Sequence, residues 1–155
     1  MTQVTVEYMI MIPLLILQIF LFPIAATVMM DHWADSRRSI ELQEVAGQLG
    51  STIQQVYYTV NSVGGNLKSN LDIPALIDGY MYTVTLGKVP NTGASYKVMN
   101  VTLCLSSSNL YSSTLVTLGN NVNWQDNLSF SSITHNLCLA ANQTGGSITL
   151  TVGGA

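Results

Sequence analysis

The sequence predicts an α+β fold, with a long N-terminal hydrophobic α-helix over residues 1–63 and an antiparallel β-sandwich, Ig-like or similar, over residues 64–155. Three observations predict it. A run of 23 uncharged residues lies near the N-terminus, a helical apolar stripe continues beyond it, and the remaining residues alternate with the period of strands. The last 92 residues suffice for one small globular core.

The uncharged run extends from Tyr8 to Met30, and only Gln18 and Thr27 interrupt its apolar character. At about 1.5 Å per residue it reaches roughly 34 Å, enough to cross the hydrocarbon core of a bilayer. The run is longer than the roughly 7 to 15 apolar residues of a secretory signal, and neither a preceding cation nor a small-residue cleavage site accompanies it. We therefore expect it to be part of the mature protein.

Two prolines, Pro13 and Pro23, lie inside this run. Each lacks an N–H and frees the carbonyl four residues earlier, so we expect a kink or a locally unwound turn at each. In lipid such freed groups are tolerated only where neighbouring protein shields them. The prolines therefore favour a helix that packs among other helices over an isolated anchor.

The helical signal continues after the apolar run as a stripe at steps of three and four residues. Its members are Leu42, Val45, Leu49, Ile53, Val56, Val60 and Val63. One helix from Tyr8 to Val63 has a length on the order of 80 Å, far more than a bilayer needs. Gly47 and Gly50 each cost it roughly 1 kcal/mol relative to Ala, which indicates a bend or a close helix–helix approach. The stripe packs against other helices, on the chain's own globular domain, or on both.

The helix is expected to stop at Gly64 and Gly65, in a segment over residues 62–66 that we interpret as a linker. Beyond it Ser, Thr and Asn supply 32 of the last 92 residues. Alternation predicts strands over residues 80–86, 99–105 and 148–152, with weaker ones over 111–118 and 137–141. Turn signals at residues 90–93, 119–121 and 144–146 separate them, and we expect six to eight strands in all.

Both cysteines, Cys104 and Cys138, lie in strand-like segments, and their immediate neighbours are leucines. The alternation therefore points both thiols away from the core. Because free exposed thiols are a liability outside the cell, we predict a disulfide between them, worth about 3 to 4 kcal/mol.

Three tripeptides match the N-glycosylation sequon, beginning at Asn100, Asn127 and Asn142. They favour an exported location for the β-rich part. A domain this rich in Asn, Ser and Thr also produces the pattern by chance.

Composition and motifs argue against several classes of protein. The last 92 residues hold three basic side chains, balanced by three aspartates, which leaves no patch for nucleic acid. Neither two cysteines nor two distant histidines give the spacing of a metal site. His32, between Asp31 and Asp35, is expected to be a solvated helix residue, and His135 a strand or loop residue. We therefore expect no enzyme, no cofactor and no metal.

Glu7 is a lone carboxylate at the edge of the apolar run. At the level of lipid headgroups it is harmless. If the helix instead packs against copies of itself, burial costs several kcal/mol unless a cation meets the carboxylate, and the only cation nearby is an α-amino group.

The orientation of the helix in the membrane is ambiguous. Arg37 and Arg38 place the large domain in the cytoplasm by the positive-inside rule, the sequons argue the reverse, and a removed basic leader reconciles the two.

The residues Gln3-Val4-Thr5-Val6-Glu7-Tyr8, followed by an apolar run, resemble the start of archaeal type IV pilins of the class III signal peptide family. Adhesion pilins and archaellins are related to them. The resemblance covers roughly the first 60 residues, while the β-rich remainder agrees in architecture alone. It implies a basic leader cut by a prepilin peptidase, a Glu as the fifth mature residue, which is Glu7 if Gln3 is the first, and an apolar helix that forms a filament core.

The sequence thus leads us to expect a pilin-like subunit that is inserted in the membrane before assembly and then lies in an extracellular filament on the cell surface. Its partners would be copies of itself and the pilus assembly machinery, its use adhesion, and its β-domains the outer wall. The predicted assembly residues are Glu7, Tyr8, Pro13, Leu17, Phe20, Pro23, Leu42, Leu49, Ile53 and Val56. One alternative is an archaellin of a swimming filament. Another is a cell-surface binding protein with a single span, whose helix ends near Trp33 while residues 39–63 fold back on the domain.

Overall fold

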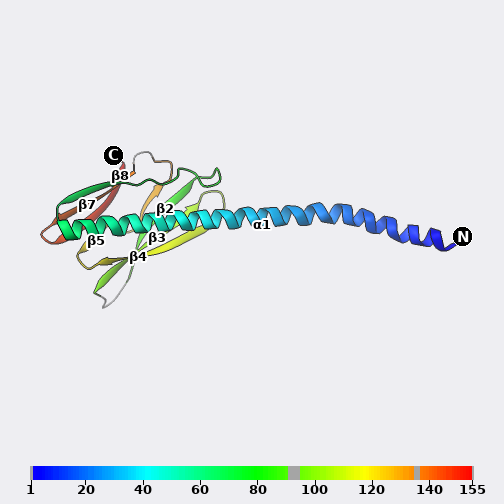
Figure 1. The fold of residues 1–155 in the computed structure, drawn as a ribbon, viewed down its shortest axis with the longest axis horizontal. Helices are drawn as coiled ribbons and strands as arrows, with labels where there is room; N and C mark the ends of the chain where they lie inside the picture. The colour runs from blue at the N-terminus through cyan, green and yellow to red at the C-terminus, as the bar shows by residue number, and fades with distance from the viewer. Residues whose placement is uncertain (1, 91–94, 135–136, 155) are drawn as a thin grey trace. The chain divides into compact units, whose positions relative to one another are not determined.

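A computed structural model describes residues 2–90, 95–134 and 137–154, without the side chains of residues 2–7 and 154. The chain forms two units, Met1–Arg37 and Arg38–Ala155. The helix α1, Thr2–Val63, is the first element and contributes to both (Figure 1). The predicted boundary at residue 63 marks the end of this helix, whereas the unit that holds the strands begins at Arg38.

The end of α1 lies where the paired glycines predict it. Gly64 and Gly65 have φ values of 77° and 93°, which glycine adopts readily. The Gly64 N–H donates to the carbonyl of Val60 at 2.9 Å, so one of the last helical carbonyls is satisfied. The first strand begins at Asn66, so the predicted linker is a tight two-residue turn.

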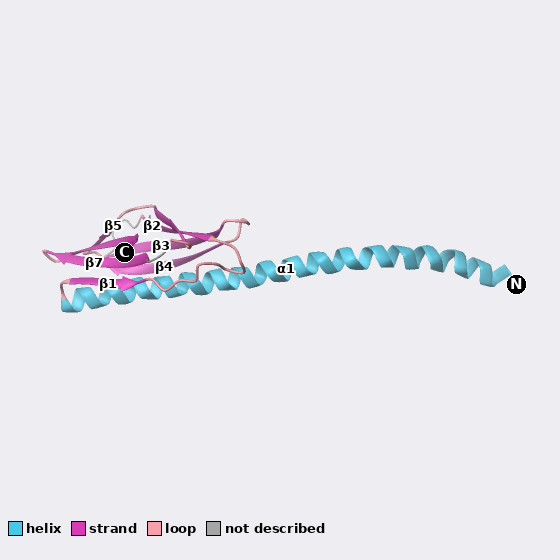
Figure 2. Ribbon diagram, turned by 90° about the horizontal axis from the view of Figure 1, so that it is seen from above, coloured by secondary structure: helices cyan, strands magenta, loops and turns pink. Residues whose placement is uncertain are grey.

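Eight strands follow, in two four-stranded sheets (Figure 2). They are β1 (Asn66–Asn70), β2 (Tyr82–Val89), β3 (Tyr96–Leu105), β4 (Tyr111–Gly119), β5 (Val122–Trp124), β6 (Leu128–Ser131), β7 (Leu137–Thr144) and β8 (Ser147–Gly154). One sheet has the order β1-β7-β8-β5 and the other β4-β3-β2-β6. This arrangement confirms the predicted α+β layout with a β-sandwich-like domain.

One strand pair departs from the expected antiparallel pattern. β5 pairs with β8 in parallel, while the other pairs are antiparallel. The chain leaves β4 in one sheet and enters the other through Asn120 and Asn121, and the Ile148 N–H donates to the Asn121 carbonyl at 2.7 Å. A crossing between sheets is not bound by hairpin geometry, which leaves the short β5 free to pair in parallel with β8.

The core combines both sheets with the last part of α1. Residues of the helical stripe are buried together with the inward-facing side chains of the strands. The buried helical residues are Leu42, Val45, Ala46, Leu49, Ile53, Val56, Tyr57 and Val60. Val63, the last residue of the predicted stripe, is exposed. Of the two partners considered for this stripe, the structure shows the chain's own domain.

The two glycines of this segment have different surroundings. A Cβ added at Gly50 would lie 3.1 Å from Cγ2 of Val116 and 3.3 Å from Cγ2 of Thr114, both on β4. Gly50 therefore permits a close approach between helix and sheet. A Cβ added at Gly47 would meet nothing within 4 Å. The fold of the single chain gives no reason for a glycine at that position.

Alanine at these two positions should have opposite effects on stability. Gly47→Ala should raise the free energy of unfolding of the Arg38–Ala155 unit by about 0.5–1 kcal/mol, because it removes the helical penalty of glycine and meets no neighbour. Gly50→Ala should lower it by about 1–3 kcal/mol, because the added methyl overpacks the contact with β4. Urea unfolding of the full chain in detergent, followed by near-UV circular dichroism, measures both. Equal stabilisation by the two variants would contradict this account of Gly50.

Tyr82, at the start of β2, forms hydrogen bonds with two other segments of the chain. Its hydroxyl donates to the Pro74 carbonyl at 2.5 Å, and its N–H donates to Oγ of Ser132 at 3.2 Å. The side chain is fully buried, and this burial raises its pKa from 10.0 to about 12.

The raised pKa of Tyr82 predicts a loss of stability at alkaline pH. The folded chain keeps the phenolic proton at pH values where the unfolded chain has lost it, so the contribution is fully present below about pH 10 and is lost as the pH rises through 12. Tyr82→Phe should lower stability by about 1 kcal/mol at neutral pH and flatten its decline above pH 10. Urea unfolding between pH 8 and 11.5, with the exposed Tyr111→Phe as control, measures the slope. Parallel curves for the native chain and Tyr82→Phe would contradict the assignment.

Candidate functional site

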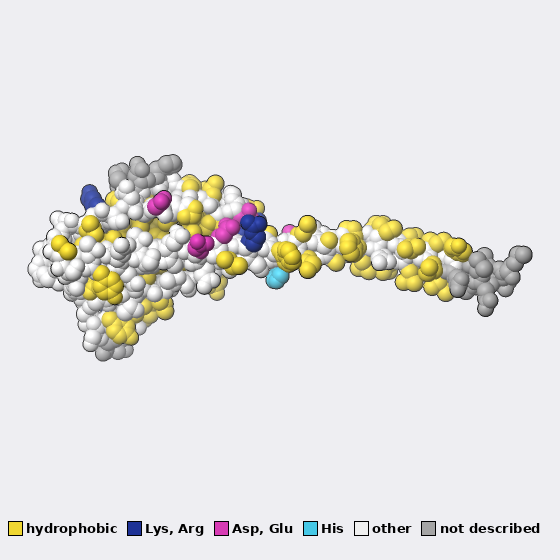
Figure 3. Space-filling model, in the orientation of Figure 1, with side chains coloured by type: hydrophobic (Ala, Val, Ile, Leu, Met, Phe, Trp, Pro, Cys, Tyr) yellow, Lys and Arg dark blue, Asp and Glu magenta, His cyan; other side chains and the backbone are white. Residues whose placement is uncertain are grey.

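The side chains of α1 between Tyr8 and Trp33 form the most conspicuous exposed surface of the described chain. Its large apolar side chains are 51% exposed at Ile16 and 80% exposed at Met9, and the others lie between these values. In Figure 3 hydrophobic atoms cover this part of α1. α1 is the only helix of the described residues long and apolar enough to cross a membrane. A helix that is apolar on all sides needs lipid or other protein around it.

Two shallow apolar grooves lie on different faces of this segment. Side chains at steps of three and four line each of them. One groove is lined by Pro13, Ile16, Leu17, Phe20, Leu21 and Ile24, and the other by Leu15, Gln18, Ile19, Phe22 and Pro23. Two separate faces can therefore each accept the ridge of a neighbouring helix.

The predicted assembly residues divide into three groups. Tyr8 is exposed, and Pro13, Leu17, Phe20 and Pro23 line the two grooves. The side chain of Glu7 lies outside the described residues.

The four remaining members of the prediction lie further along α1, where each is at most 4% exposed. They are Leu42, Leu49, Ile53 and Val56. In the single chain they belong to the core that α1 shares with the sheets, so they offer little exposed surface to another subunit.

α1 is uninterrupted at both prolines, so the locally unwound turn considered above is absent from the described residues. Thr27 donates from Oγ1 to the carbonyl of Pro23 at 2.5 Å, a local bond that satisfies this hydroxyl within the apolar run. The single-span alternative predicted that the helix ends near Trp33, but α1 continues to Val63.

Charged residues begin at Asp31, after the apolar run. Arg38, the first residue of the second unit, donates from Nε to Oδ2 of Asp78 at 2.7 Å and lies 4.8 Å from the ring centroid of Tyr80. Asp78 and Gly79 have positive φ values and form the tight turn of the Ile77–Tyr80 bridge. Tyr80 therefore precedes β2 and packs on Arg38, although the alternation had placed it in a strand.

The predicted disulfide is wrong. Cys104 and Cys138 are both free, on β3 and β7, which belong to different sheets. Their leucine neighbours are buried, so the thiols point outward from opposite sides of the sandwich. Sheets pack about 10 Å apart, whereas a disulfide needs Cα atoms within about 7 Å.

The three sequon asparagines differ in exposure. Asn127 and Asn142 are exposed, and Asn127 has a φ of 53° in the turn before β6. Asn100, on the inner strand β3, is half-buried, and its Oδ1 is buried without a hydrogen-bond partner among the described residues. Its neighbours across the strands are Gly87 and Leu115.

Glycan occupancy should follow this exposure. When an N-glycosylating host exports the chain, we expect modified Asn127 and Asn142 and unmodified Asn100, because its amide is packed between strands. Glycopeptide mass spectrometry measures occupancy at each site, with Thr144→Ala as the control that removes the third sequon. An occupied Asn100 would contradict the prediction.

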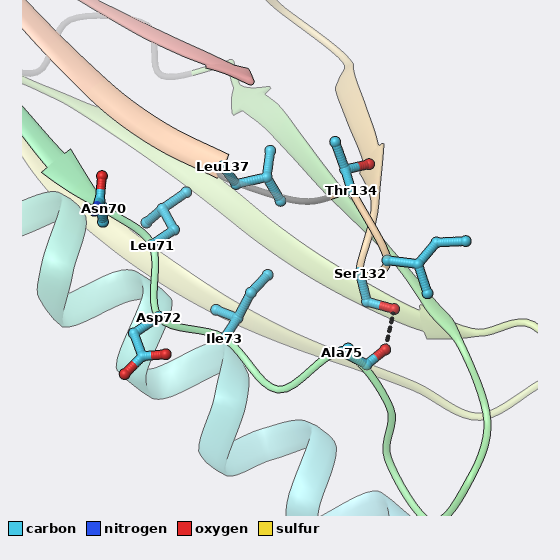
Figure 4. A pocket seen from close by; sticks show the side chains of 9 residues that line it. Asn70, Leu71, Asp72, Ile73, Ala75, Ser132, Thr134 and Leu137 are labelled. Carbon is cyan, nitrogen blue, oxygen red and sulfur yellow. Dashed lines mark hydrogen bonds between the residues drawn. The ribbon is translucent and has the colours of Figure 1, made fainter. Parts of the chain in front are cut away.

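A cleft of about 530 Å³ in the β-rich unit lies between residues 70–75 on one side and residues 132–134 and Leu137 on the other (Figure 4). Its one buried hydroxyl, Ser132, donates to the Ala75 carbonyl at 2.7 Å and accepts the N–H of Tyr82. That hydroxyl is therefore engaged in joining two segments of backbone. His32 is exposed on α1, and His135 lies outside the described residues. No group of three metal-binding side chains occurs among the residues that the structure describes.

No protein-family model, curated protein or solved structure matches the chain.

Proposed function

We propose that this chain is a structural subunit, a pilin, of an extracellular type IV pilus-like filament, and that it polymerises through α1. The observation that carries the proposal is the apolar segment of α1 between Tyr8 and Trp33, which is exposed on every face in the single chain. The resemblance of the N-terminal residues to type IV pilins supports the same assignment. Adhesion is the proposed use of the filament.

The exposed segment needs an apolar environment in every state of the protein. Each large side chain gains about 1.5–3 kcal/mol on leaving water. Lipid provides this environment before assembly, and neighbouring helices provide it afterwards. Because lipid is as apolar as the side chains, assembly depends on packing between helices, and two grooved faces allow each helix more than one neighbour.

The two prolines fit this role better than that of an isolated anchor. Pro13 and Pro23 each remove a helical hydrogen bond within the apolar run, yet α1 continues through both. Carbonyls freed in this way are better shielded by adjacent helices than by lipid alone.

A cell-surface binding protein with a single span is the alternative. The membrane-compatible length of α1 fits this alternative as well as it fits a pilin. The folded β-rich unit fits it too, as a binding module. This alternative gives the two grooved faces no occupant other than lipid. An archaellin of a swimming filament remains a second possibility within the filament class.

Removal of the Glu7 carboxylate separates these functions. Glu7→Ala should reduce filaments at least tenfold, because the proposed pairing of the carboxylate with an α-amino group is worth several kcal/mol once both are buried. The chain should remain in the membrane with its β-rich unit folded. Electron microscopy and immunoblotting of sheared cell-surface material measure assembly, and near-UV circular dichroism checks the fold.

The matched control is Tyr58→Ala, which removes an exposed aromatic side chain from α1 within the Arg38–Ala155 unit. It should leave membrane insertion intact. If the native chain is itself missing from helical filaments and stays with membranes, the filament proposal is wrong and the single-span alternative stands.

A further inference from the structure

Two lysines share one opening of the β-rich unit. After Gly64 the chain has three basic residues, Lys68, Lys88 and Lys97. Lys88 and Lys97 both line an opening of about 230 Å³ at the junction of the β2 end, the β3 start and β5. Trp124 and Asn123 of β5 complete its polar and aromatic lining. In a unit with so few charges, this is a local concentration of positive charge.

The strand alternation explains why these ammonium groups converge. Lys88 lies two residues after the buried Leu86 on β2, and Lys97 lies two residues before the buried Met99 on β3. Both side chains therefore leave their strands on the face that carries the core. Trp124 approaches from the other sheet. The opening therefore lies at one end of the core, where a lysine takes the next inward-facing position after the buried apolar residues of each strand.

The groups at this opening are rich in donors. Nζ of Lys97 donates to the Val122 carbonyl at 2.6 Å and to Oδ1 of Asn123 at 2.9 Å, which leaves its third proton. Nζ of Lys88 lies 5.8 Å from the ring centroid of Trp124. The indole Nε1 of Trp124 is buried and has no hydrogen-bond partner among the described residues.

Asp126, the carboxylate that accepts the backbone N–H of Lys88, forms no ion pair with either lysine side chain among the described residues. Asp126 accepts the backbone N–H groups of Lys88 and Asn127 at one oxygen, at 2.7 and 3.0 Å. In the described part of the chain neither lysine forms an ion pair with a carboxylate. Two positive charges therefore line the opening, and the ammonium group of Lys88 and the third proton of Lys97 have no acceptor among the described residues.

We propose that this opening binds a small oxyanion, a phosphate or a carboxylate group. Such a group offers the acceptors that Lys88 and Lys97 lack, and its charge is attracted by both ammonium groups. A sugar ring has no stacking surface here, because Lys88 lies over the indole and Trp124 is 6% exposed. The site is independent of filament assembly.

Trp124 provides a direct reporter. The chain has two tryptophans, so Trp33→Phe leaves Trp124 as the single tryptophan, adjacent to Lys88, and excitation at the red edge of the absorption band avoids the tyrosines. The full chain with this substitution is titrated in detergent with sodium phosphate and, separately, with sodium acetate, at an ionic strength held constant with sodium chloride. A saturable change in Trp124 emission is expected with phosphate, with acetate or with both, and the comparison identifies the preferred oxyanion.

Lysine variants on this background locate the binding. Lys88→Gln should weaken it about tenfold or more, since one charged hydrogen-bond partner is lost. Lys68→Gln is the matched control, because Lys68 is exposed on β1 and does not line the opening. Lys88 is preferred to Lys97 for the test, because Lys97 also caps the Val122 carbonyl. The proposal fails if neither anion gives a saturable change, or if Lys88→Gln and Lys68→Gln bind alike.

Discussion

The structure of residues 38–155 depends on the burial of one helical stripe against two sheets. Eight side chains between Leu42 and Val60 share a core with the inner faces of both sheets. Val116 and Leu118 of β4 belong to the same buried cluster, and Val116 lies close to Gly50 of the helix. Each large apolar group contributes about 1.5–3 kcal/mol by its burial, so the stripe is a substantial part of the apolar burial in this unit. Gly50 sets the distance of the helix from β4.

This constraint restricts what the rest of α1 can contact. The sequence alone makes residues 8–30 and the later stripe equally plausible as assembly surfaces, because both are apolar and helical. Once the sheets cover the stripe, the apolar side chains from Tyr8 to Trp33 are what remains for lipid or for other subunits. On the later segment Gly47 is exposed and is not covered by the sheets, and the fold of the single chain does not explain a glycine at this position.

Local periodicity accounts for the parts of the fold that could be predicted. The helix, its end at the paired glycines, the three more regular strands and the two weaker ones follow from patterns within a few residues. β5 and β6 were not predicted because three or four residues are too few to show a periodic pattern. β1 was not predicted because Leu67 is its one apolar side chain. Tyr80 was misassigned because the turn at Asp78 and Gly79 interrupts an apparent alternation.

The missed features of the candidate sites depend on contacts between distant segments. Alternation correctly turned Cys104 and Cys138 outward, but it gives no indication of which sheet each strand joins, and that decides whether they can bond. An amphipathic stripe shows that a helix packs against another apolar surface, but it does not show whether that surface belongs to the same chain or to another one. The meeting of Lys88, Lys97 and Trp124 likewise requires the strand order, because β5 lies in the sheet opposite β2 and β3.

If the chain assembles as proposed, the division between a covered and an uncovered stretch of one helix has an energetic consequence. Residues 42–60 keep the same neighbours whether the subunit is in a membrane or among its copies, so their contribution cancels between the two states. The difference then depends on the side chains from Tyr8 to Trp33, which exchange lipid for protein. Since both surroundings are apolar, the hydrophobic effect is nearly equal in them, and shape complementarity at the two grooves must supply the preference. Small changes of side-chain shape in this segment should therefore affect assembly more than changes of its total hydrophobicity.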